Sequence, residues 1–184
     1  MLKIWGRANS INVQKVLWCA AELGLEFERT DVGGPFGGTD TNEYRAMNPM
    51  GLIPTIVDGE TTLWESHTCI RYLVAKHDTG NLWQHNIAAR AESEKWMDWV
   101  LTTVNRPMTT IFKGLIRTPE AERNLDEIEN AKETMGRLWA IADERLADQN
   151  YLASTQFTIA DLALGPYAYR FFGLFGKKKE LSNV

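Results

Sequence analysis

The stretch LIPTIVDGETTLWES, residues 52–66, decides the fold because it combines a proline, a hairpin and a helix start. Thr55–Val57 and Thr61–Trp64 have the character of short strands on either side of Asp58-Gly59. Asp-Gly favours the positive φ angles of a type I′ turn, so the two strands are predicted to form a β-hairpin. Pro54 comes directly before the first strand, where a proline removes no hydrogen bond from the ladder.

A helix is predicted to begin directly after the hairpin. Ser66 is placed to N-cap it, and apolar residues follow at helical spacing, among them Ile70, Leu73 and Val74. The first backbone amides of a helix have no partner within it, so this position is suited to bind a carboxylate.

The residues before this stretch predict alternating strands and helices. Leu2–Trp5 and Glu26–Val32 are expected to be strands, and Asn12–Leu23 a helix with apolar residues at spacings of three and four. This order favours a parallel strand pair joined by a right-handed crossover. The glycine-rich segment 33–41 is expected to be a loop, and Glu43–Met47 a short helix.

The character of the chain changes after His77, where polar and turn-forming residues give way to helical periodicity. Residues 1–78 are therefore expected to form an α/β domain in the order βαβ, ββα, and residues 79–86 a linker. Residues 87–184 are expected to form an all-helical bundle domain.

Three helical segments are predicted in that second domain. Ile87–Ile116 has helical periodicity and should be interrupted or kinked at Pro107. Glu120–Leu146 carries an apolar stripe at three-four spacing. Thr158 is placed to N-cap the last helix, with Asp161 three residues later able to complete a capping box.

The composition narrows the function classes. The chain has 184 residues, a formal charge of −4 and a pI near 5.5, which argues against a nucleic-acid partner because that needs a basic surface. No apolar run approaches the roughly 18 residues of a membrane-spanning helix, and no secretory leader opens the chain, so a cytoplasmic location is expected. Cys19 and Cys69 are expected to be buried free thiols, and the irregularly spaced histidines predict no metal site.

Three segments resemble the glutathione transferase family in order and spacing: GRANSINVQKVLW (6–18), MNPMGLIPTIVDGETTLWES (47–66) and FTIADLALGPYAYR (157–170). The resemblance covers essentially the whole chain and is to the bacterial branch related to the theta, zeta and nu classes. It implies a thioredoxin-like N-terminal domain that binds glutathione, a helical C-terminal domain that shapes the second-substrate pocket, and a homodimer. The implied activity is detoxifying conjugation of glutathione, as co-substrate, to small hydrophobic electrophiles.

Ser10 lies between the first strand and the first helix, where the unpaired amides of that helix point. Lowering the pKa of a thiol from about 8.5 by ~2 units requires ~2.7 kcal/mol of preferential thiolate stabilisation. A hydrogen bond to a charged group supplies roughly 1.5–3 kcal/mol, and a helix start about 0.3–1. The resemblance implies that Ser10 and the Asn12 amide donate to the sulfur of glutathione; alternatively, both residues only cap the helix.

The resemblance implies further contacts with glutathione. A cis Ile53-Pro54 bond would let the Ile53 backbone pair with the cysteinyl backbone of glutathione. Glu65 would bind the ammonium of the γ-glutamyl end and Ser66 its carboxylate. Many relatives carry a lysine where this chain has Leu52, so loop polar groups such as Thr39 are expected to bind the glycyl carboxylate instead.

The resemblance implies that Asn105 and Arg106, beside Pro107, line the second-substrate pocket, with Arg106 either steering an anionic electrophile or binding glutathione. Two alternative functions stay open. One is a glutathione-dependent disulfide reductase or peroxidase, which would need two glutathione molecules because the chain has no C-x-x-C motif. The other is a non-catalytic binding protein of the same fold. Relatives usually continue past Leu181–Val184 into a final helix, which the helical domain is expected to lack unless a tail follows.

Overall fold

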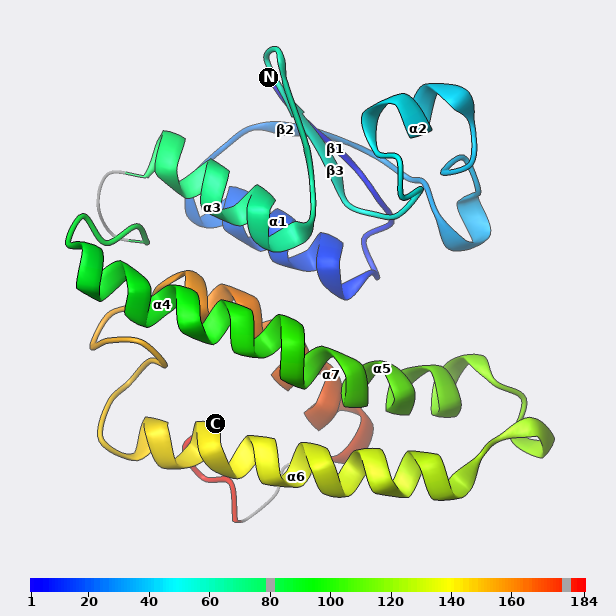
Figure 1. Ribbon diagram of the computed structural model, residues 1–184, viewed down its shortest axis with the longest axis vertical. Helices are drawn as coiled ribbons and strands as arrows, with labels where there is room; N and C mark the ends of the chain where they lie inside the picture. Colours follow the sequence, from blue (N-terminus) through cyan, green and yellow to red (C-terminus); the bar gives the residue numbers. More distant parts are fainter. Residues whose placement is uncertain (79–81, 177–179) are drawn as a thin grey trace. The chain divides into compact units, whose positions relative to one another are not determined.

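Two units of different architecture make up the chain, Met1–Trp83 (unit 1) and Gln84–Val184 (unit 2), shown in Figure 1. The computed structural model describes residues 1–78, 82–176 and 180–184. Residues 79–81 of the expected linker therefore lie outside the described residues. Within the part of the chain that is described, no helix is long and apolar enough to cross a membrane.

Unit 1 is built on a four-stranded mixed sheet with the strand order β2-β1-β3-β4. Strand β1 (Leu2–Trp5) pairs in parallel with β2 (Phe27–Thr30) and antiparallel with β3 (Thr55–Asp58), which pairs antiparallel with β4 (Thr61–Trp64). Helix α1 (Ile11–Glu22) joins the parallel pair. This arrangement confirms the predicted thioredoxin-like domain.

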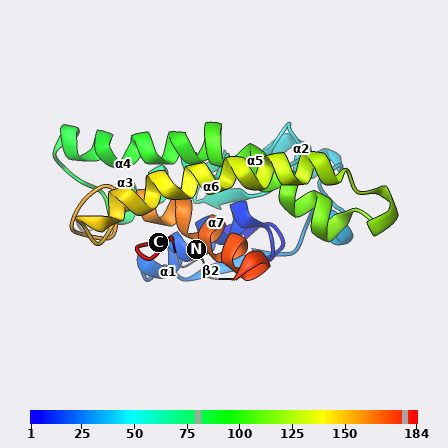
Figure 2. The same cartoon turned by 90° about the horizontal axis from the view of Figure 1, so that it is seen from below.

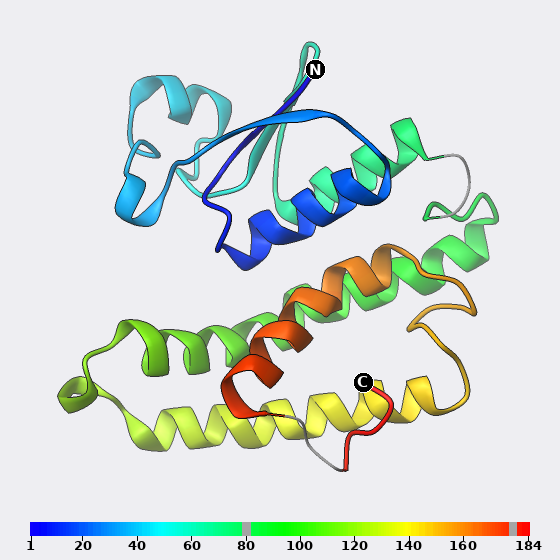
Figure 3. The same cartoon turned by 180° about the vertical axis from the view of Figure 1, so that it is seen from behind.

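Helices α1 and α3 (Ser66–His77) lie side by side against one face of the sheet, and α2 (Asn42–Met47) lies apart from them (Figures 1 and 3). The segment 33–41 is a loop apart from one 3₁₀ turn, η1 (Gly34–Phe36). The core between the sheet and the two helices is formed by fully buried apolar side chains: Ile4, Val13, Val16, Ala20, Ile56, Ile70, Leu73 and Val74.

The two cysteines belong to this core. Cys19 and Cys69 are free and fully buried, which confirms the prediction. Burial raises the pKa of each thiol to about 12, so neither is a nucleophile near neutral pH.

The hairpin of β3 and β4 is present, but the predicted turn type was wrong. Asp58 pairs with Thr61, so the loop residues are Gly59 and Glu60 rather than Asp58 and Gly59. Gly59 has a φ of 61° and Glu60 a negative φ, which is the pattern of a type II′ turn rather than type I′.

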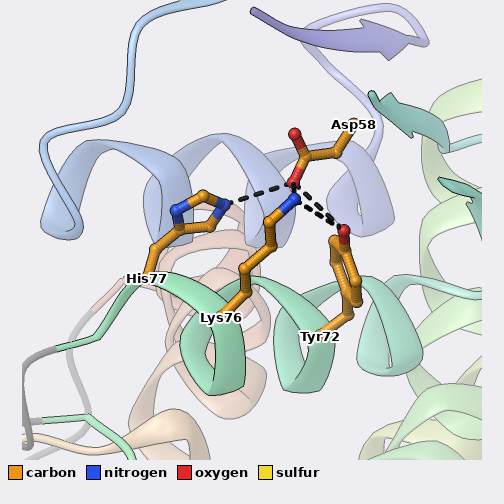
Figure 4. Close-up of polar contacts among 4 residues, drawn as sticks. All are labelled: Asp58, Tyr72, Lys76 and His77. Atoms are coloured by element: carbon orange, nitrogen blue, oxygen red, sulfur yellow. Dashed lines mark hydrogen bonds and ion pairs between the residues drawn. The ribbon is translucent and has the colours of Figure 1, made fainter. Parts of the chain in front are cut away.

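Contacts with α3 explain why Asp58 belongs to the strand (Figure 4). One oxygen of its carboxylate, Oδ2, accepts hydrogen bonds from Lys76 Nζ at 2.8 Å and from Tyr72 Oη at 3.2 Å. The same oxygen lies 3.2 Å from His77 Nε2. Burial alone would raise the pKa of Asp58, but the bonds from Lys76 and His77 outweigh it and leave this pKa below its ordinary value. The C-terminal turns of α3 thus hold the end of β3 in the sheet.

Unit 2 is all-helical, as predicted, with α6 running beside the α4–α5 segment and α7 packed against α4 (Figures 1 and 2). Its elements are α4 (Ile87–Trp99), the π-helical η2 (Val100–Val104), α5 (Asn105–Phe112), the π-helical η3 (Lys113–Arg117), the 3₁₀ turn η4 (Glu120–Glu122), α6 (Leu125–Ala147) and α7 (Ile159–Phe175). Its core contains buried side chains from four of these helices: Met97, Met108, Ile111, Met135, Trp139, Leu162 and Tyr167.

The interruption expected at Pro107 takes the form of a π-helical turn. Pro107 has no N–H to donate to the carbonyl of Thr103, and its ring crowds that carbonyl. The turn before it is η2, where the Asn105 amide donates to the Val100 carbonyl five residues earlier. The helical run continues through α5 and η3 to Arg117.

The predicted start of α6 was wrong, whereas the predicted start of α7 is confirmed. The helix predicted from Glu120 begins at Leu125, because the Asn124 side chain caps it by accepting from the Glu127 amide at 3.2 Å. The capping box of α7 is confirmed, with the Asp161 carboxylate accepting from the Thr158 amide at 2.9 Å.

Candidate functional site

Ser10 occupies the start of α1 without capping it. Its carbonyl accepts from the Gln14 amide at 2.8 Å, but its side chain makes no capping hydrogen bond. The residue is only 9% exposed, and its hydroxyl has no hydrogen-bond partner among the described residues. The alternative that Ser10 merely caps the helix therefore loses its main physical basis. The Ser10 hydroxyl is therefore buried next to the first backbone amides of α1 without forming a capping bond to them.

The turn between β1 and α1 is held tightly in place. Gly6 has a φ of 150°, and a Cβ at this position would lie 2.5 Å from Val13 Cγ2, so only glycine allows this approach. The amides of Gly6 and Arg7 donate to the carbonyls of Thr30 and Val32, at 2.9 and 3.2 Å. Ser10 is thereby placed on a rigid support at the end of the central parallel pair.

Asn12 lies in the first turn of α1, two residues after Ser10. Its Oδ1 accepts a hydrogen bond from Lys15 Nζ at 3.1 Å, and the same ammonium lies 3.0 Å from His67 Nε2, in the first turn of α3. Lys15 is fully buried and His67 only 3% exposed. Sequence reasoning missed Lys15 because a polar pair at i, i+3 is the ordinary pattern of a solvated helix face. It missed the role of His67 because that residue lies 52 positions from Lys15 in the chain.

The Ile53-Pro54 peptide bond is cis, as the resemblance implied. The preceding carbonyl, that of Leu52, accepts from Tyr44 Oη at 2.7 Å and from Asn48 Nδ2 at 2.9 Å. Both donors also contact Thr55 Oγ1, and all three of these residues are buried. Tyr44 and Asn48 therefore fix the backbone on both sides of Ile53, a role that only their pairing in three dimensions reveals.

Glu65, not Ser66, is the N-cap of α3, which corrects the prediction. Its φ is 68° and its ψ 112°, and it is the one non-glycine residue in the described ranges with a positive φ. Such a conformation costs about 1–3 kcal/mol and is typical of functional sites. Ser66 is the first helical residue and is buried, so its amide and hydroxyl both lie at the helix start.

The surroundings of Leu52 provide a cation that sequence reasoning did not identify. Leu52 itself is 59% exposed. A Cβ on the preceding Gly51 would lie 2.9 Å from the Thr39 carbonyl and 3.2 Å from Arg45 Nη2. Arg45, at the end of α2, also donates to the Pro49 carbonyl at 3.2 Å. Thr39 and Arg45 thus lie close together beside Gly51, the residue before Leu52.

Asn105 and Arg106 line one cavity of about 590 Å³ within unit 2. Asn105 Oδ1 accepts a hydrogen bond from the buried Tyr167 hydroxyl at 2.9 Å, so this side chain is fixed from α7. Burial raises the pKa of Tyr167, which keeps it a donor. The rest of the lining is largely polar and includes Thr109, Lys113, Glu122 and Glu127.

The described residues contain no cluster of three or more histidine, cysteine, aspartate or glutamate side chains able to hold a metal ion. The starts of α1 and α3 in unit 1 carry hydroxyls, backbone amides and one amide side chain, from Ser10, Asn12 and Ser66. They are suited to bind anions and amides. Fold and site together define a thioredoxin-like protein with a cis-proline loop and an added all-helical domain.

Comparison with known proteins gives the family. The family model described as "Glutathione S-transferase, N-terminal domain" matches residues 9–76. A second family model, "Glutathione S-transferase, C-terminal domain", matches residues 125–181. Glutathione S-transferase GstB of Escherichia coli K12 is 39% identical over 176 residues, which cover 95% of this chain and 85% of GstB. Glutathione S-transferase F13 of Arabidopsis thaliana is 31% identical over 175 residues, covering 92% and 80%.

Solved structures agree with the sequence matches. The theta class glutathione S-transferase of Xanthomonas axonopodis pv. citri, crystallised with glutathione bound, superposes with a TM-score of 0.94 at 43% identity, covering 99% of this chain and 87% of that one. Glutathione transferase F7 of Populus trichocarpa gives a TM-score of 0.87 at 26% identity, covering 100% and 87%. The chain belongs to the glutathione S-transferase family, which confirms the predicted resemblance and fold.

Proposed function

We propose that this protein is a glutathione transferase in which Ser10 and the start of α1 stabilise the thiolate of glutathione for attack on a small electrophile. The buried Ser10 hydroxyl, not used as a cap, is the observation that carries this proposal. A hydrogen bond to a charged acceptor contributes roughly 1.5–3 kcal/mol and a helix start about 0.3–1, enough to lower a thiol pKa by ~2 units. The thiolate is then the nucleophile, and Ser10 remains a donor.

The rest of unit 1 supports a binding mode for the tripeptide. The backbone of Ile53 pairs with the cysteinyl residue by strand addition. Glu65 takes the ammonium of the γ-glutamyl end, and the hydroxyl and amide of Ser66 take its carboxylate. Thr39 and Arg45 receive the glycyl carboxylate, with Arg45 replacing the cation that Leu52 does not supply.

Unit 2 supplies the pocket for the second substrate in this proposal. The cavity that contains Asn105 and Arg106 is large enough for a small ligand, and Arg106 and Lys113 give it two cations suited to an anionic group on the electrophile. Family membership supports a homodimer. The two buried free thiols, Cys19 and Cys69, suit a reducing compartment and support a cytoplasmic location.

The test is the variant Ser10→Ala, with Ser93→Ala, a buried serine in α4, as its matched control. Conjugation of glutathione to a chloronitroaromatic should fall by roughly tenfold or more in Ser10→Ala, since the lost bond contributes about 1.5–3 kcal/mol. The pKa of bound glutathione, followed by thiolate absorbance, should rise. The control should match the unmodified protein.

Other outcomes identify the alternatives. Unchanged conjugation and an unchanged thiol pKa in Ser10→Ala would exclude the assigned role of Ser10. Turnover of hydroxyethyl disulfide without conjugation would favour a disulfide reductase using two glutathione molecules. Absence of glutathione binding by calorimetry would favour a non-catalytic protein of this fold.

A further inference from the structure

Lys15 is the buried charged group that the proposed function leaves without a role. It is fully buried on α1, one turn after Asn12, and burying an ammonium is costly unless hydrogen bonds compensate. Its Nζ lies 3.1 Å from Asn12 Oδ1 and 3.0 Å from His67 Nε2. These two partners belong to the first turns of α1 and α3, the two helix starts assigned to glutathione.

The chemistry of the ammonium determines how its neighbours are oriented. Lysine has three donors and no acceptor, so it presents hydrogens to the oxygen of the Asn12 amide and to a ring nitrogen of His67. The Asn12 amide is then held with its oxygen toward Lys15 and its NH₂ group on the opposite side. That NH₂ group has no hydrogen-bond partner among the residues that the structure describes. Loss of the donor at Nζ would remove the hydrogen bond that distinguishes the two ends of this amide.

We propose that Lys15 is a positioning residue: it holds the Asn12 amide with its donor end toward the sulfur of glutathione and, through His67, fixes the start of α3 beside Ser66. Lys15 itself does not touch glutathione. The inference rests on the proposed function and adds Lys15 to it. This residue lies 52 positions before His67 in the sequence and links the starts of α1 and α3. Its effect on the thiolate passes through Asn12.

A double-mutant cycle tests this route. Lys15→Met, Asn12→Ala and the double variant are compared by the pKa of enzyme-bound glutathione, measured from ultraviolet thiolate absorbance, and by kcat and KM. Lys15→Met should raise the thiol pKa and lower the thiolate fraction at neutral pH by roughly tenfold, as expected for the loss of a hydrogen bond to a charged group. In the Asn12→Ala background the same change should have no further effect.

Two further variants separate positioning from folding. Lys15→Gln keeps a side-chain donor, so the pKa of bound glutathione should stay close to its value in the unmodified protein. This variant also keeps the test possible if Lys15→Met does not fold. Gln14→Met, at the neighbouring position of α1, is the matched control and should leave the thiol pKa unchanged.

Each outcome has a distinct meaning. An equal rise in thiol pKa from Lys15→Met in both backgrounds would overturn the inference, because Lys15 would then act by its charge and not through Asn12. No rise from Lys15→Met, combined with a rise in Ser10→Ala, would overturn the inference and leave the proposed function standing. An ordinary thiol pKa for glutathione bound to the unmodified protein would overturn both.

Discussion

Helix α3 is tied to the rest of unit 1 at each end by a lysine and a histidine, and the two ends differ in burial. At its start, Lys15 is 0% and His67 3% exposed. At its end, the side chains of Lys76 and His77 are 43% and 27% exposed, around the carboxylate of Asp58 (Figure 4). Water screens the charges at the second end, whereas the first end depends on the geometry of its hydrogen bonds.

The difference in burial between the two ends of α3 separates the roles of two otherwise similar lysine–histidine clusters. The exposed cluster explains a structural fact, the inclusion of Asp58 in β3, and needs no ligand. The buried cluster includes Asn12 and adjoins Ser66, two residues proposed to bind glutathione. Two predictions compare the two ends of α3 directly, and a third concerns the exposed end alone.

The largest effect is expected from histidine replacement at the buried end. His67→Leu removes an acceptor from the buried Lys15 ammonium, and the free energy of unfolding should fall by roughly 1–3 kcal/mol. The matched control is His77→Leu at the exposed end, which should cost less because water can replace the lost bond. Urea denaturation of both variants measures the difference. Equal losses would show that burial does not distinguish the two ends.

A smaller effect is expected from Asp58→Asn. The exposed partner Lys76 loses its ion pair, and such pairs contribute little to stability because water screens them. Because salt screens exposed charges, the loss should largely disappear in ~1 M sodium chloride, where the Debye length is about 3 Å. The loss in His67→Leu should persist under the same conditions. A salt-independent effect of Asp58→Asn would place its carboxylate in a less hydrated environment than the contacts indicate.

The smallest effect is the pH dependence of the Asp58 cluster. The pKa of Asp58 in the folded protein lies below its ordinary value, about 3.9 in an unfolded chain. Its contribution to stability is therefore fully present above that value, and it is lost as the pH falls through the lowered pKa of the folded state. Unfolding midpoints of the unmodified protein and of Asp58→Asn should converge below about pH 4. If the unfolding midpoint of the unmodified protein instead rose further above that of Asp58→Asn on acidification, the pKa of Asp58 would not be lowered by folding.

Much of the fold could be predicted because its signals are local. The four strands, the β-α-β order and the capping box of Thr158 and Asp161 each depend on residues close together in the chain. The turn of the hairpin was wrong because a tertiary contact overrides local preference: Asp58 joins the ladder because α3 holds it. The start of α6 was wrong because a local signal was overlooked: Asn124 caps the helix, which begins later than the apolar stripe suggested.

The candidate site divides in the same way. Ser10 and Ser66 could be proposed from their positions before and at helix starts, together with the family resemblance. The buried supports could not, because they join residues far apart in sequence: Lys15 with His67, and Tyr44 with Leu52. Neither sequence separation nor residue type distinguishes such a pair from two solvated side chains.

The sequence by itself determined the two-domain order, the thioredoxin-like topology, the family and the residues at the helix starts, since short-range periodicity, turn residues and motif spacing encode them. Only the tertiary structure decided that Glu65 adopts a positive φ, that Ser10 does not cap its helix and that an ammonium lies buried between α1 and α3. These features arise when the helices pack on the sheet, because burial then determines which polar groups must bond to one another.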